Sequence, residues 1–537
     1  MTRNLASFVL FAIALSAQQA SPLKPGKVEG VVLNSVTNEP VKKAMVTLQV
    51  LEGRANYVSV TDPAGHFHFD SVGPGKYQAM ANRDGFIPTP ESQRNSWAKP
   101  IAVAEEQQVK DVVVKLLPLA VVSGHVFDED GDPVMRAQVQ ALRYVYHQGG
   151  VRQLQPAGFA STNDLGEYQL LDLEPGRYYF RVAVHSGAMR LPVPSKSAAP
   201  EQTYPDVFYP NALQAEQATA SQVAPGARLT SLDFRIHKAP AFHIRGRVVD
   251  GRTGQAMRNE AIQIQARGGV SSAYVPTQRN GTFDAGGVVS GSYILAGQTR
   301  DVSSHQVLDV GDHDIDDLVV VMQPPFEISG TVRLEGAPPP AEHRGKMRVN
   351  LNSIEMGNGA GAEVNADGSF GLKVTPLVYQ IYASCDAGAY VKSMHFGDQD
   401  VTAGKIDLTS QTTGALNIVC ATDVGQIQGS VQNENGEPAV QVMITIAPDD
   451  EHLSRVDMFY QLSSDQNGKF DYRDFAPGEY KIFAWESGEA EMLESVEFRE
   501  AFESRAVSVS LTPGGNASVQ LKLIPAADIE AEKNKLP

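Results

Sequence analysis

The chain has 537 residues, of which 42% are hydrophobic and 20% charged, and its formal net charge at pH 7 is −17. This composition is that of a globular protein and excludes a disordered chain, and the length allows about three to five domains. An acidic chain without a run of Lys and Arg lacks the phosphate-neutralising surface of a nucleic-acid binder, so we expect no nucleic-acid partner.

Residues 1–20 have the layout of a secretory signal peptide. Arg3 lies in a short cationic head, an apolar run extends from Leu5 to Leu15, and small residues follow that run. The run is shorter than the about 20 residues of a membrane-spanning helix, and no later segment is long and apolar enough to cross a bilayer. We therefore expect an exported protein, periplasmic, extracellular or at the cell surface, without a transmembrane segment.

A predicted strand with a glycine at its centre recurs along the chain. Its copies are VEGVV from Val28, VSGHV from Val122, IRGRV from Ile244, ISGTV from Ile328 and IQGSV from Ile427. The starts are separated by 94, 122, 84 and 99 residues. A spacing of about 100 residues is that of one small β-sandwich domain per repeat.

A polar turn that ends in glycine follows in each repeat, and an aromatic residue stands two positions later. The turn glycines are Gly65, Gly166, Gly281, Gly368 and Gly468, and the aromatic residues are Phe67, Tyr168, Phe283, Phe370 and Phe470. Glycine permits the positive φ of a tight hairpin, so we expect the ring to begin a strand at an inward-facing position.

A further strand in each repeat begins with tyrosine, after a Pro-Gly turn in three of the repeats. These residues are Tyr77, Tyr178, Tyr293, Tyr379 and Tyr480. By analogy with the tyrosine corner of sandwich domains, we expect each hydroxyl to bind nearby backbone. A closing strand ends each repeat, and proline follows four of the five closing strands.

This order of landmarks resembles the carboxypeptidase regulatory-like domain. The motifs are the glycine-centred strand, a polar turn with Pro, the D-x-x-G-x-F hairpin and the PG-x-Y strand. The resemblance implies a transthyretin-like, seven-stranded Greek-key sandwich related to collagen-adhesin B-type and starch-binding-like domains. The segment from Tyr209, YPNALQAEQATASQVAPGARLTSLDFRI, also resembles a stretch common in secreted multi-repeat proteins of soil bacteria such as Acidobacteria.

The predicted fold is therefore all-β, a tandem array of five immunoglobulin-like or transthyretin-like Greek-key sandwiches. Their expected ranges are 26–118, 119–240, 241–324, 325–424 and 425–525, followed by a charged tail at 526–537. The second repeat is lengthened by an insertion at 186–226, which is rich in Pro and Ala and holds Tyr204, Phe208 and Tyr209. Exposed rings in a long loop can stack on sugars or anchor peptides, and these three are the candidate binding residues, whereas the alternative is that they cover the sandwich.

The only two cysteines, Cys385 and Cys420, lie 35 positions apart in the fourth repeat. We expect a disulfide between them in an oxidising compartment, and two buried thiols are the alternative. Asp128, Asp130 and Asp132 resemble the opening of a calcium loop, but the distal glutamate of an EF-hand is missing and a turn is favoured. We therefore predict no metal site.

The sequence contains none of the common catalytic motifs. No histidine starts an H-x-x-E or H-E-x-x-H pattern, and neither a G-x-S-x-G elbow nor a Walker loop is present. We therefore expect a secreted, non-enzymatic, multi-domain binding or spacer protein without a cofactor, whose partner is an extracellular protein or a polysaccharide. The alternative is an array of carbohydrate-binding modules that acts on extracellular polysaccharide.

Overall fold

The structure, a computed structural model, describes residues 24–53, 56–89, 100–147, 150–184, 201–267, 272–299, 301–337, 347–354, 359–410, 414–449, 455–533 and 535. The predicted signal peptide lies outside these residues, as does part of the predicted insertion, 186–200. The chain divides into two compact units. The first runs to Val122 and includes Leu171–Pro175 and Val223–Leu229, and the second holds Ser123–Leu170, Gly176–Gln222 and Thr230–Pro537.

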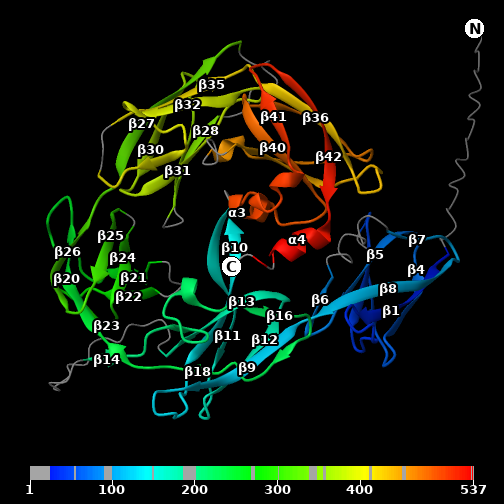
Figure 1. The fold of residues 1–537 in the computed structure, drawn as a ribbon, viewed down its shortest axis with the longest axis horizontal. Helices are drawn as coiled ribbons and strands as arrows, with labels where there is room; N and C mark the ends of the chain where they lie inside the picture. The colour runs from blue at the N-terminus through cyan, green and yellow to red at the C-terminus, as the bar shows by residue number, and fades with distance from the viewer. Residues whose placement is uncertain are drawn as a thin grey trace, which may run out of the picture. The chain divides into compact units, whose positions relative to one another are not determined.

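The first unit contains a pair of four-stranded sheets with orders β4-β1-β8-β6 and β3-β2-β5-β7, which we call the first sandwich (Figure 1). Its strands are β1 (Gly26–Asn34), β2 (Met45–Val50), β3 (Asn56–Val60), β4 (His66–Val72), β5 (Gly75–Asn82), β6 (Phe86–Pro88), β7 (Ile101–Val103) and β8 (Gln108–Pro118). The opening strand β1 pairs antiparallel with β4 and parallel with β8.

The next stretch forms the second sandwich, with sheets β11-β10-β13-β15 and β12-β9-β17, where β16 also pairs with β13 and β18 with β9. Its elements are β9 (Ala120–Phe127), β10 (Gln138–His147), β11 (Val151–Ser161), β12 (Glu167–Leu173), β13 (Gly176–Ala183), β14 (Gln202–Thr203), β15 (Val207–Phe208), η1 (Ala215–Gln217), β16 (Ser221–Val223), β17 (Arg228–Leu229), β18 (Phe234–Arg235) and β19 (Ala239–Pro240). Since β15 and β16 belong to the predicted insertion, that segment completes a sheet of the sandwich.

The third sandwich pairs the sheet β23-β20-β26 with the sheet β22-β21-β24-β25. Its strands are β20 (Phe242–Asp250), β21 (Ala261–Ala266), β22 (Ser272–Pro276), β23 (Thr282–Val288), β24 (Gly291–Gln298), β25 (Ser303–Val310) and β26 (Ile315–Met322). The opening strand β20 again pairs antiparallel with the hairpin strand β23 and parallel with the closing strand β26.

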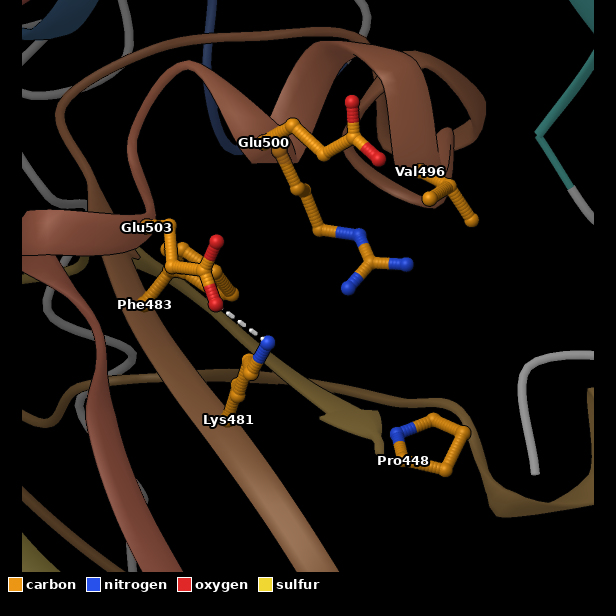
Figure 2. A pocket seen from close by; sticks show the side chains of 7 residues that line it. Pro448, Lys481, Phe483, Val496, Glu500 and Glu503 are labelled. Carbon is orange, nitrogen blue, oxygen red and sulfur yellow. Dashed lines mark hydrogen bonds and ion pairs between the residues drawn. The ribbon is translucent and has the colours of Figure 1, made fainter. Parts of the chain in front are cut away.

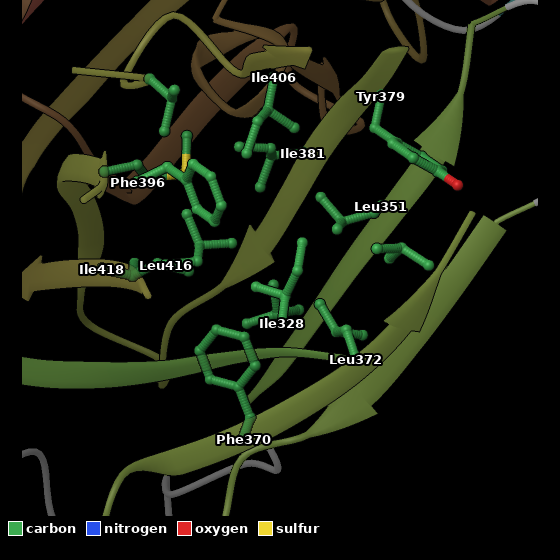
Figure 3. Packing of buried hydrophobic residues seen from close by; sticks show 14 of the residues in the cluster. Ile328, Leu351, Phe370, Leu372, Tyr379, Ile381, Phe396, Ile406, Leu416 and Ile418 are labelled. Carbon is green, nitrogen blue, oxygen red and sulfur yellow. The ribbon is translucent and has the colours of Figure 1, made fainter. Parts of the chain in front are cut away.

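The fourth sandwich has the sheets β30-β27-β35-β32-β33 and β29-β28-β31-β34. Its strands are β27 (Phe326–Glu335), β28 (Arg348–Ser353), β29 (Gly359–Glu363), β30 (Ser369–Val374), β31 (Val378–Ser384), β32 (Tyr390–Phe396), β33 (Gln399–Asp400), β34 (Lys405–Asp407) and β35 (Leu416–Ala421). Figure 3 shows how Ile328, Leu351 and Phe370 converge from these strands into its core.

In the fifth sandwich both layers belong to one sheet of order β38-β37-β40-β42-β36-β39, and β41 pairs with β40. Its elements are β36 (Gly425–Gln432), β37 (Met443–Pro448), η4 (Val456–Met458), β38 (Tyr460–Ser463), β39 (Lys469–Phe475), β40 (Gly478–Trp485), α2 (Ala490–Leu493), α3 (Val496–Glu500), η5 (Glu503–Arg505), β41 (Val507–Leu511), β42 (Asn516–Ile524) and α4 (Ala526–Lys533). The predicted all-β sandwich fold is thus confirmed, while the number of independently folding domains stays a prediction.

Short helices are the feature of the fold that the sequence analysis did not anticipate. Helices α2 and α3 stand between β40 and β41, and α4 occupies most of the predicted tail. Ile529 in α4 is fully buried beside Trp485 and Phe498, so this part of the tail packs on a core instead of lying free. The sequence of 526–537 does not predict this packing, because the segment is rich in charged residues and a single buried residue on a short helix gives almost no periodic signal.

The five repeated glycines have a common physical cause. A Cβ on any of them would overlap a carbonyl oxygen of the closing segment: Gly30 meets Val112, Gly124 meets Leu232, Gly246 meets Leu318, Gly330 meets Leu416 and Gly429 meets Val519. The aromatic ring two positions after the turn also lies against this glycine in the first, fourth and fifth sandwiches. The missing side chain therefore lets the opening strand, the closing segment and the buried ring pack together.

The predicted role of the repeated tyrosines is confirmed for four of them. Each donates its hydroxyl proton to the carbonyl oxygen four residues earlier: Tyr77 to Gly73 at 2.7 Å, Tyr293 to Val289 at 2.9 Å, Tyr379 to Thr375 at 2.9 Å and Tyr480 to Ala476 at 2.7 Å. In Figure 3 the hydroxyl of Tyr379 points away from the apolar cluster. The ring packs in the core while its hydroxyl group binds the backbone of the turn, so the buried donor is satisfied.

Candidate functional site

The larger of two hollows lies on the outward face of the third sandwich, is open to solvent and has a volume of about 590 Å³. We call it the sandwich-3 groove. It is lined by Arg245, Gly246, Arg247, Gln278, Thr282, Phe283, Asp284, Asp316, Asp317 and Val319. A volume of this size falls within the range of about 300–1,000 Å³ that is typical of small-ligand sites.

The alternation of β20 places charged side chains in this groove. Ile244 and Val248 are buried in the core, so Arg245 and Arg247 between them face outward. Across the ladder Arg245 lies opposite Asp284 and Arg247 opposite Thr282 on β23. Both partners consequently face the same hollow as the two arginines.

The other wall of the groove comes from the start of β26. The register of β20 and β26 shifts between Ile244 and Gly246, and Asp317 has a φ of +59° at this irregularity. Such a bulge re-aims the neighbouring side chains, and Asp316 and Asp317 both line the groove.

Arg245 holds three carboxylates together at one end of the groove. Its Nε lies 3.3 Å from Asp284 Oδ2, and its Nη1 lies 2.9 Å from Asp314 Oδ2 and 3.0 Å from Asp316 Oδ1. The guanidinium side chain is 37% exposed, so these pairs order the groove more than they stabilise the fold.

His243 joins the same network to the predicted insertion, through Glu201. Its Nδ1 lies 2.5 Å from Asp284 Oδ1, its Nε2 lies 2.7 Å from Glu201 Oε2, and its backbone N–H donates to Asp314 Oδ1 at 2.9 Å. Burial lowers the pKa of His243, but the hydrogen bonds to Asp284 and Glu201 outweigh burial, so the pKa is raised. Because both ring nitrogens face carboxylate oxygens, the imidazolium form, which donates from both, fits this geometry best.

The three aromatic residues predicted as a binding site occupy different environments. Phe208 is 5% exposed and packs with Leu142 and Tyr179. Tyr209 is partly buried and meets the ring of Phe234 edge-on, with centroids 5.9 Å apart. Phe208 is therefore buried in a small apolar cluster against β10 and β13, which agrees with the alternative that these rings cover the sandwich.

Tyr204 is partly exposed and belongs to a polar cluster. Its hydroxyl donates to Glu129 Oε2 at 3.2 Å, and Lys238 Nζ lies 5.3 Å above its ring and 2.9 Å from Glu129 Oε1. The hydrogen bond from Lys238 is the main cause that lowers the pKa of Glu129. Tyr204 and Tyr209 are thus both partly accessible, in contrast to Phe208, and ligand binding by the predicted set stays a prediction.

Cys385 and Cys420 are joined by a disulfide in the structure, with an S–S distance of 2.03 Å. Cys420 is buried in the core of the fourth sandwich and Cys385 packs against that core. Both cysteines therefore belong to one hydrophobic cluster, and the bond closes a loop within it.

The aspartates at 128–132 form a turn. Asp128 Oδ1 accepts the backbone N–H groups of Asp130 at 3.0 Å and Asp132 at 2.9 Å. Throughout the described residues, no group of three or more His, Cys, Asp or Glu is arranged to hold a metal ion. Over that same part of the chain, no helix has both the length and the apolar character needed to cross a membrane.

A second, smaller hollow of about 70 Å³ lies beside helix α3 in the fifth sandwich (Figure 2). Lys481 and Glu503 form an ion pair at its wall, and Arg499, Val496 and Pro448 complete it. A space of this volume holds only a few water molecules, so we do not assign a ligand to it.

Sequence reasoning missed the sandwich-3 groove, although two signals for it were present. The opening strand IRGRV is the copy of the five that carries arginine on both sides of its glycine, and HDIDD at 313–317 is strongly acidic. Only the parallel pairing of β20 with β26 shows that the two runs are neighbours.

Comparison with solved structures finds matches of low similarity. A streptococcal ancillary pilin is 14% identical with a TM-score of 0.20, and the match covers 56% of this chain and 99% of the pilin. The Bacillus anthracis TIE protein is 8% identical with a TM-score of 0.15, over 90% of this chain and 99% of that protein. The Bacillus cereus major pilin subunit BcpA is 10% identical with a TM-score of 0.16, and the match covers 56% of this chain and 100% of BcpA.

No curated protein matches the chain. A family model does match its first sandwich, in agreement with the motifs around Gly30, Gly65 and Tyr77. Residues 27–115 match the carboxypeptidase regulatory-like domain, and this stretch is therefore the part of the chain whose predicted family is supported.

Proposed function

We propose that the chain is an exported, non-enzymatic, multi-domain binding protein, and that the sandwich-3 groove is its ligand site. The observation that carries the proposal is the groove itself, in which two arginines and three aspartates line a hollow of about 590 Å³. Ordered donors and acceptors in a concave surface are the usual basis of ligand recognition. The partner is an extracellular protein or a polysaccharide.

The composition of the groove supports binding without catalysis. Its lining contains neither serine, cysteine nor histidine, the side chains of the usual nucleophile–base pairs. Export is supported by the signal-peptide layout of residues 1–20 together with the disulfide, because disulfides persist in oxidising compartments.

The alternative function, an array of carbohydrate-binding modules, is favoured by the alternation of donors and acceptors in the groove. Arg247, Gln278 and Thr282 can donate, while Asp284 and Asp317 accept. Sugar hydroxyls both donate and accept, so a neutral polyhydroxylated ligand matches a lining of this kind better than an anion, which the carboxylates would repel.

The first prediction concerns adhesion to the source cells. We expect the fluorescently labelled chain to bind intact cells of its source organism, and Arg247→Ala combined with Asp317→Ala to weaken binding about tenfold, because each replaced group loses a charge-assisted hydrogen bond. Flow cytometry against protein concentration measures the effect.

A matched control is available in the fifth sandwich, where Asp471 lies opposite Gln428 as Asp284 lies opposite Arg245. Asp471→Ala should leave binding unchanged. Competition by soluble starch, xylan or β-glucan would favour the carbohydrate alternative, and loss of binding after protease treatment of the cells would favour a protein partner. Equal binding by the groove double variant and the unmodified chain would exclude the groove as the site.

A further inference from the structure

Each sandwich has a sheet that ends in an edge strand at the equivalent place. These strands are β3, β11, β22, β29 and β38, each standing first in the order of its sheet. An edge strand presents unpaired backbone N–H and C=O groups, which another chain can pair with unless the edge is protected.

Four of these edge strands carry a protective feature. Strand β11 contains Pro156 beside a register shift, and β22 ends in Pro276. Strand β29 ends in Glu363, which lies 3.7 Å from Arg348 on the neighbouring strand. At β38 the side chain of Gln461 donates to the carbonyl of Ala490 in helix α2 at 2.8 Å, so a helix stands beside that strand. Proline, bulges, charges and covering elements are the usual devices against edge pairing.

Strand β3, with the sequence NYVSV, shows none of these features within the part of the chain that the structure describes. Its five residues include neither a charge nor a proline, and its pairing with β2 runs without a register shift from Asn56 to Val60. Two of its three outward side chains are apolar, since Val58 and Val60, which follow Asn56 on that face, are 61% and 62% exposed. This contrast with the other four edges marks β3 as a place for strand pairing.

The apolar surface continues from β3 across the sheet. Met45 lies opposite Val60, and Thr47 lies between Val58 and Met80. Met45 and Met80 are both exposed large hydrophobic residues. The outward face therefore carries a contiguous patch of Met45, Val58, Val60 and Met80, which we call the β3 patch.

Strand β3 is also held firmly in place from within. Tyr57 points inward, accepts a hydrogen bond from the backbone N–H of Gly73 at 3.0 Å, and packs edge-on against Tyr77 and Phe69. An edge fixed in this way needs little ordering when it pairs, which reduces the entropic cost of association.

The free backbone groups of β3 can be assigned from its neighbour. The N–H of Thr61 donates to the carbonyl oxygen of Ala44, the residue just before β2. Since these groups alternate in direction along an antiparallel strand, the N–H and C=O of Val58 and Val60 point to the open edge. A second β3 in antiparallel orientation places Val58 opposite Val58 of the other copy and meets complementary donors and acceptors there.

Charge favours a second copy as the occupant of this edge. Residues 26–118 contain ten Lys and Arg and ten Asp and Glu, so the first sandwich is neutral while the whole chain carries −17. A domain with no net charge does not repel its own copy, and such domains associate readily. Because NYVSV contains no charged residue, pairing with its own copy brings no like charges opposite each other.

We propose that the chain forms a homodimer in which strand β3 of one copy pairs antiparallel with strand β3 of another, covering the β3 patch on both. The two four-stranded sheets then form one continuous sheet through a symmetric interface, in which each copy contributes the same residues. This interface is separate from the sandwich-3 groove and does not depend on its ligand.

Sedimentation velocity of the purified chain over a range of concentrations tests the proposal. We expect a reversible dimer, and Val58→Lys should raise its dissociation constant about tenfold or more, because two lysines would meet directly across the symmetry axis. Phe159→Lys is the matched control, since Phe159 is 74% exposed on the protected strand β11, and it should leave the dissociation constant unchanged.

A second variant separates lost pairing from lost folding. Val60→Pro removes an N–H that faces the open edge and spares the ladder with β2, so circular dichroism should show an intact sandwich while the dimer is lost. A chain that sediments as a monomer at every concentration, or a dimer that Val58→Lys and Val60→Pro leave unchanged, would refute the proposal. A monomeric chain that binds a synthetic NYVSV peptide would assign the edge to a foreign strand instead.

Discussion

At the scale of single residues, the repeated landmarks of this chain are packing requirements. The central glycine exists because a Cβ would overlap a main-chain oxygen, as at Gly246 against Leu318. The tyrosine at the strand start satisfies its own hydroxyl through a carbonyl four residues back, as Tyr480 does with Ala476. These interactions lie within a few residues or one sheet, so the motif can be repeated without any change in its surroundings.

The glycine requirement can be tested within the third sandwich. We expect Gly246→Ala to lower the free energy of unfolding by about 3 kcal/mol, because backbone must move to admit the methyl group. Gly311→Ala is the control, since its nearest neighbours, atoms of the His313 ring, are at ordinary contact distance and its φ is not positive. Chemical denaturation measures both variants. An equal free energy of unfolding for Gly246→Ala and Gly311→Ala would show that the backbone admits a methyl group at position 246 without loss of stability.

At the scale of elements, His243 on β20 ties the segment before β14 to β23 and to the residue before β26. It bonds Glu201, which precedes β14, and Asp284 on β23, while its backbone binds Asp314 just before β26. Arg245 forms ion pairs with Asp284 and Asp314 as well, and with Asp316 in addition. The contact between these elements therefore consists of ion pairs and hydrogen bonds, which we call the joint, whereas the cores of the sandwiches are apolar.

This joint should depend on pH. The folded pKa of His243 is raised above its unfolded value of about 6.5, so its stabilising contribution is fully present below that value and is lost as pH rises through the folded pKa. We expect Glu201→Gln to lower the pKa of His243, measured by NMR titration of its ring proton. A neutral control is Gln202→Ala, at the adjacent exposed position. An unchanged pKa in Glu201→Gln would contradict the joint.

At the scale of the whole molecule, the hydrophobic residues form separate clusters. One cluster lies in the first unit around Val28 and Leu48, and others in the second unit surround Ile244, Ile328 and Ile427. Clusters that share few contacts unfold independently, so calorimetry should resolve more than one transition. The disulfide belongs to one of these clusters alone.

Reduction of the disulfide should therefore affect a single transition. The bond spans 35 residues, and a loop of that length corresponds to about 4 kcal/mol of stabilisation in the chain-entropy model. We expect a reductant to lower the midpoint of one calorimetric transition and leave the others in place. The double variant Cys385→Ser, Cys420→Ser should not respond. Two thiols that alkylate in the native, unreduced protein would contradict the bond.

The sequence by itself determined the sandwich fold, the repeated turns and the inward rings. These rest on alternation, turn residues and steric exclusion, which act over short distances and leave a direct trace in the order of residues. It also limited any intrachain disulfide to Cys385 with Cys420, because the chain has no other cysteine, while two free thiols stayed the alternative.

Only the tertiary structure decided which polar runs become neighbours and which rings are covered. Arg247 and Asp317 lie 70 positions apart and meet through the pairing of β20 with β26, which neither local pattern specifies. Phe208 resembles a loop aromatic in sequence, yet β15 pairs with β13 and buries it. Val58 on β3 and Tyr274 on β22 are both exposed residues of edge strands. They differ in that β22 ends in a proline and β3 does not. Such outcomes depend on contacts between distant segments, so the fold has to form before they exist.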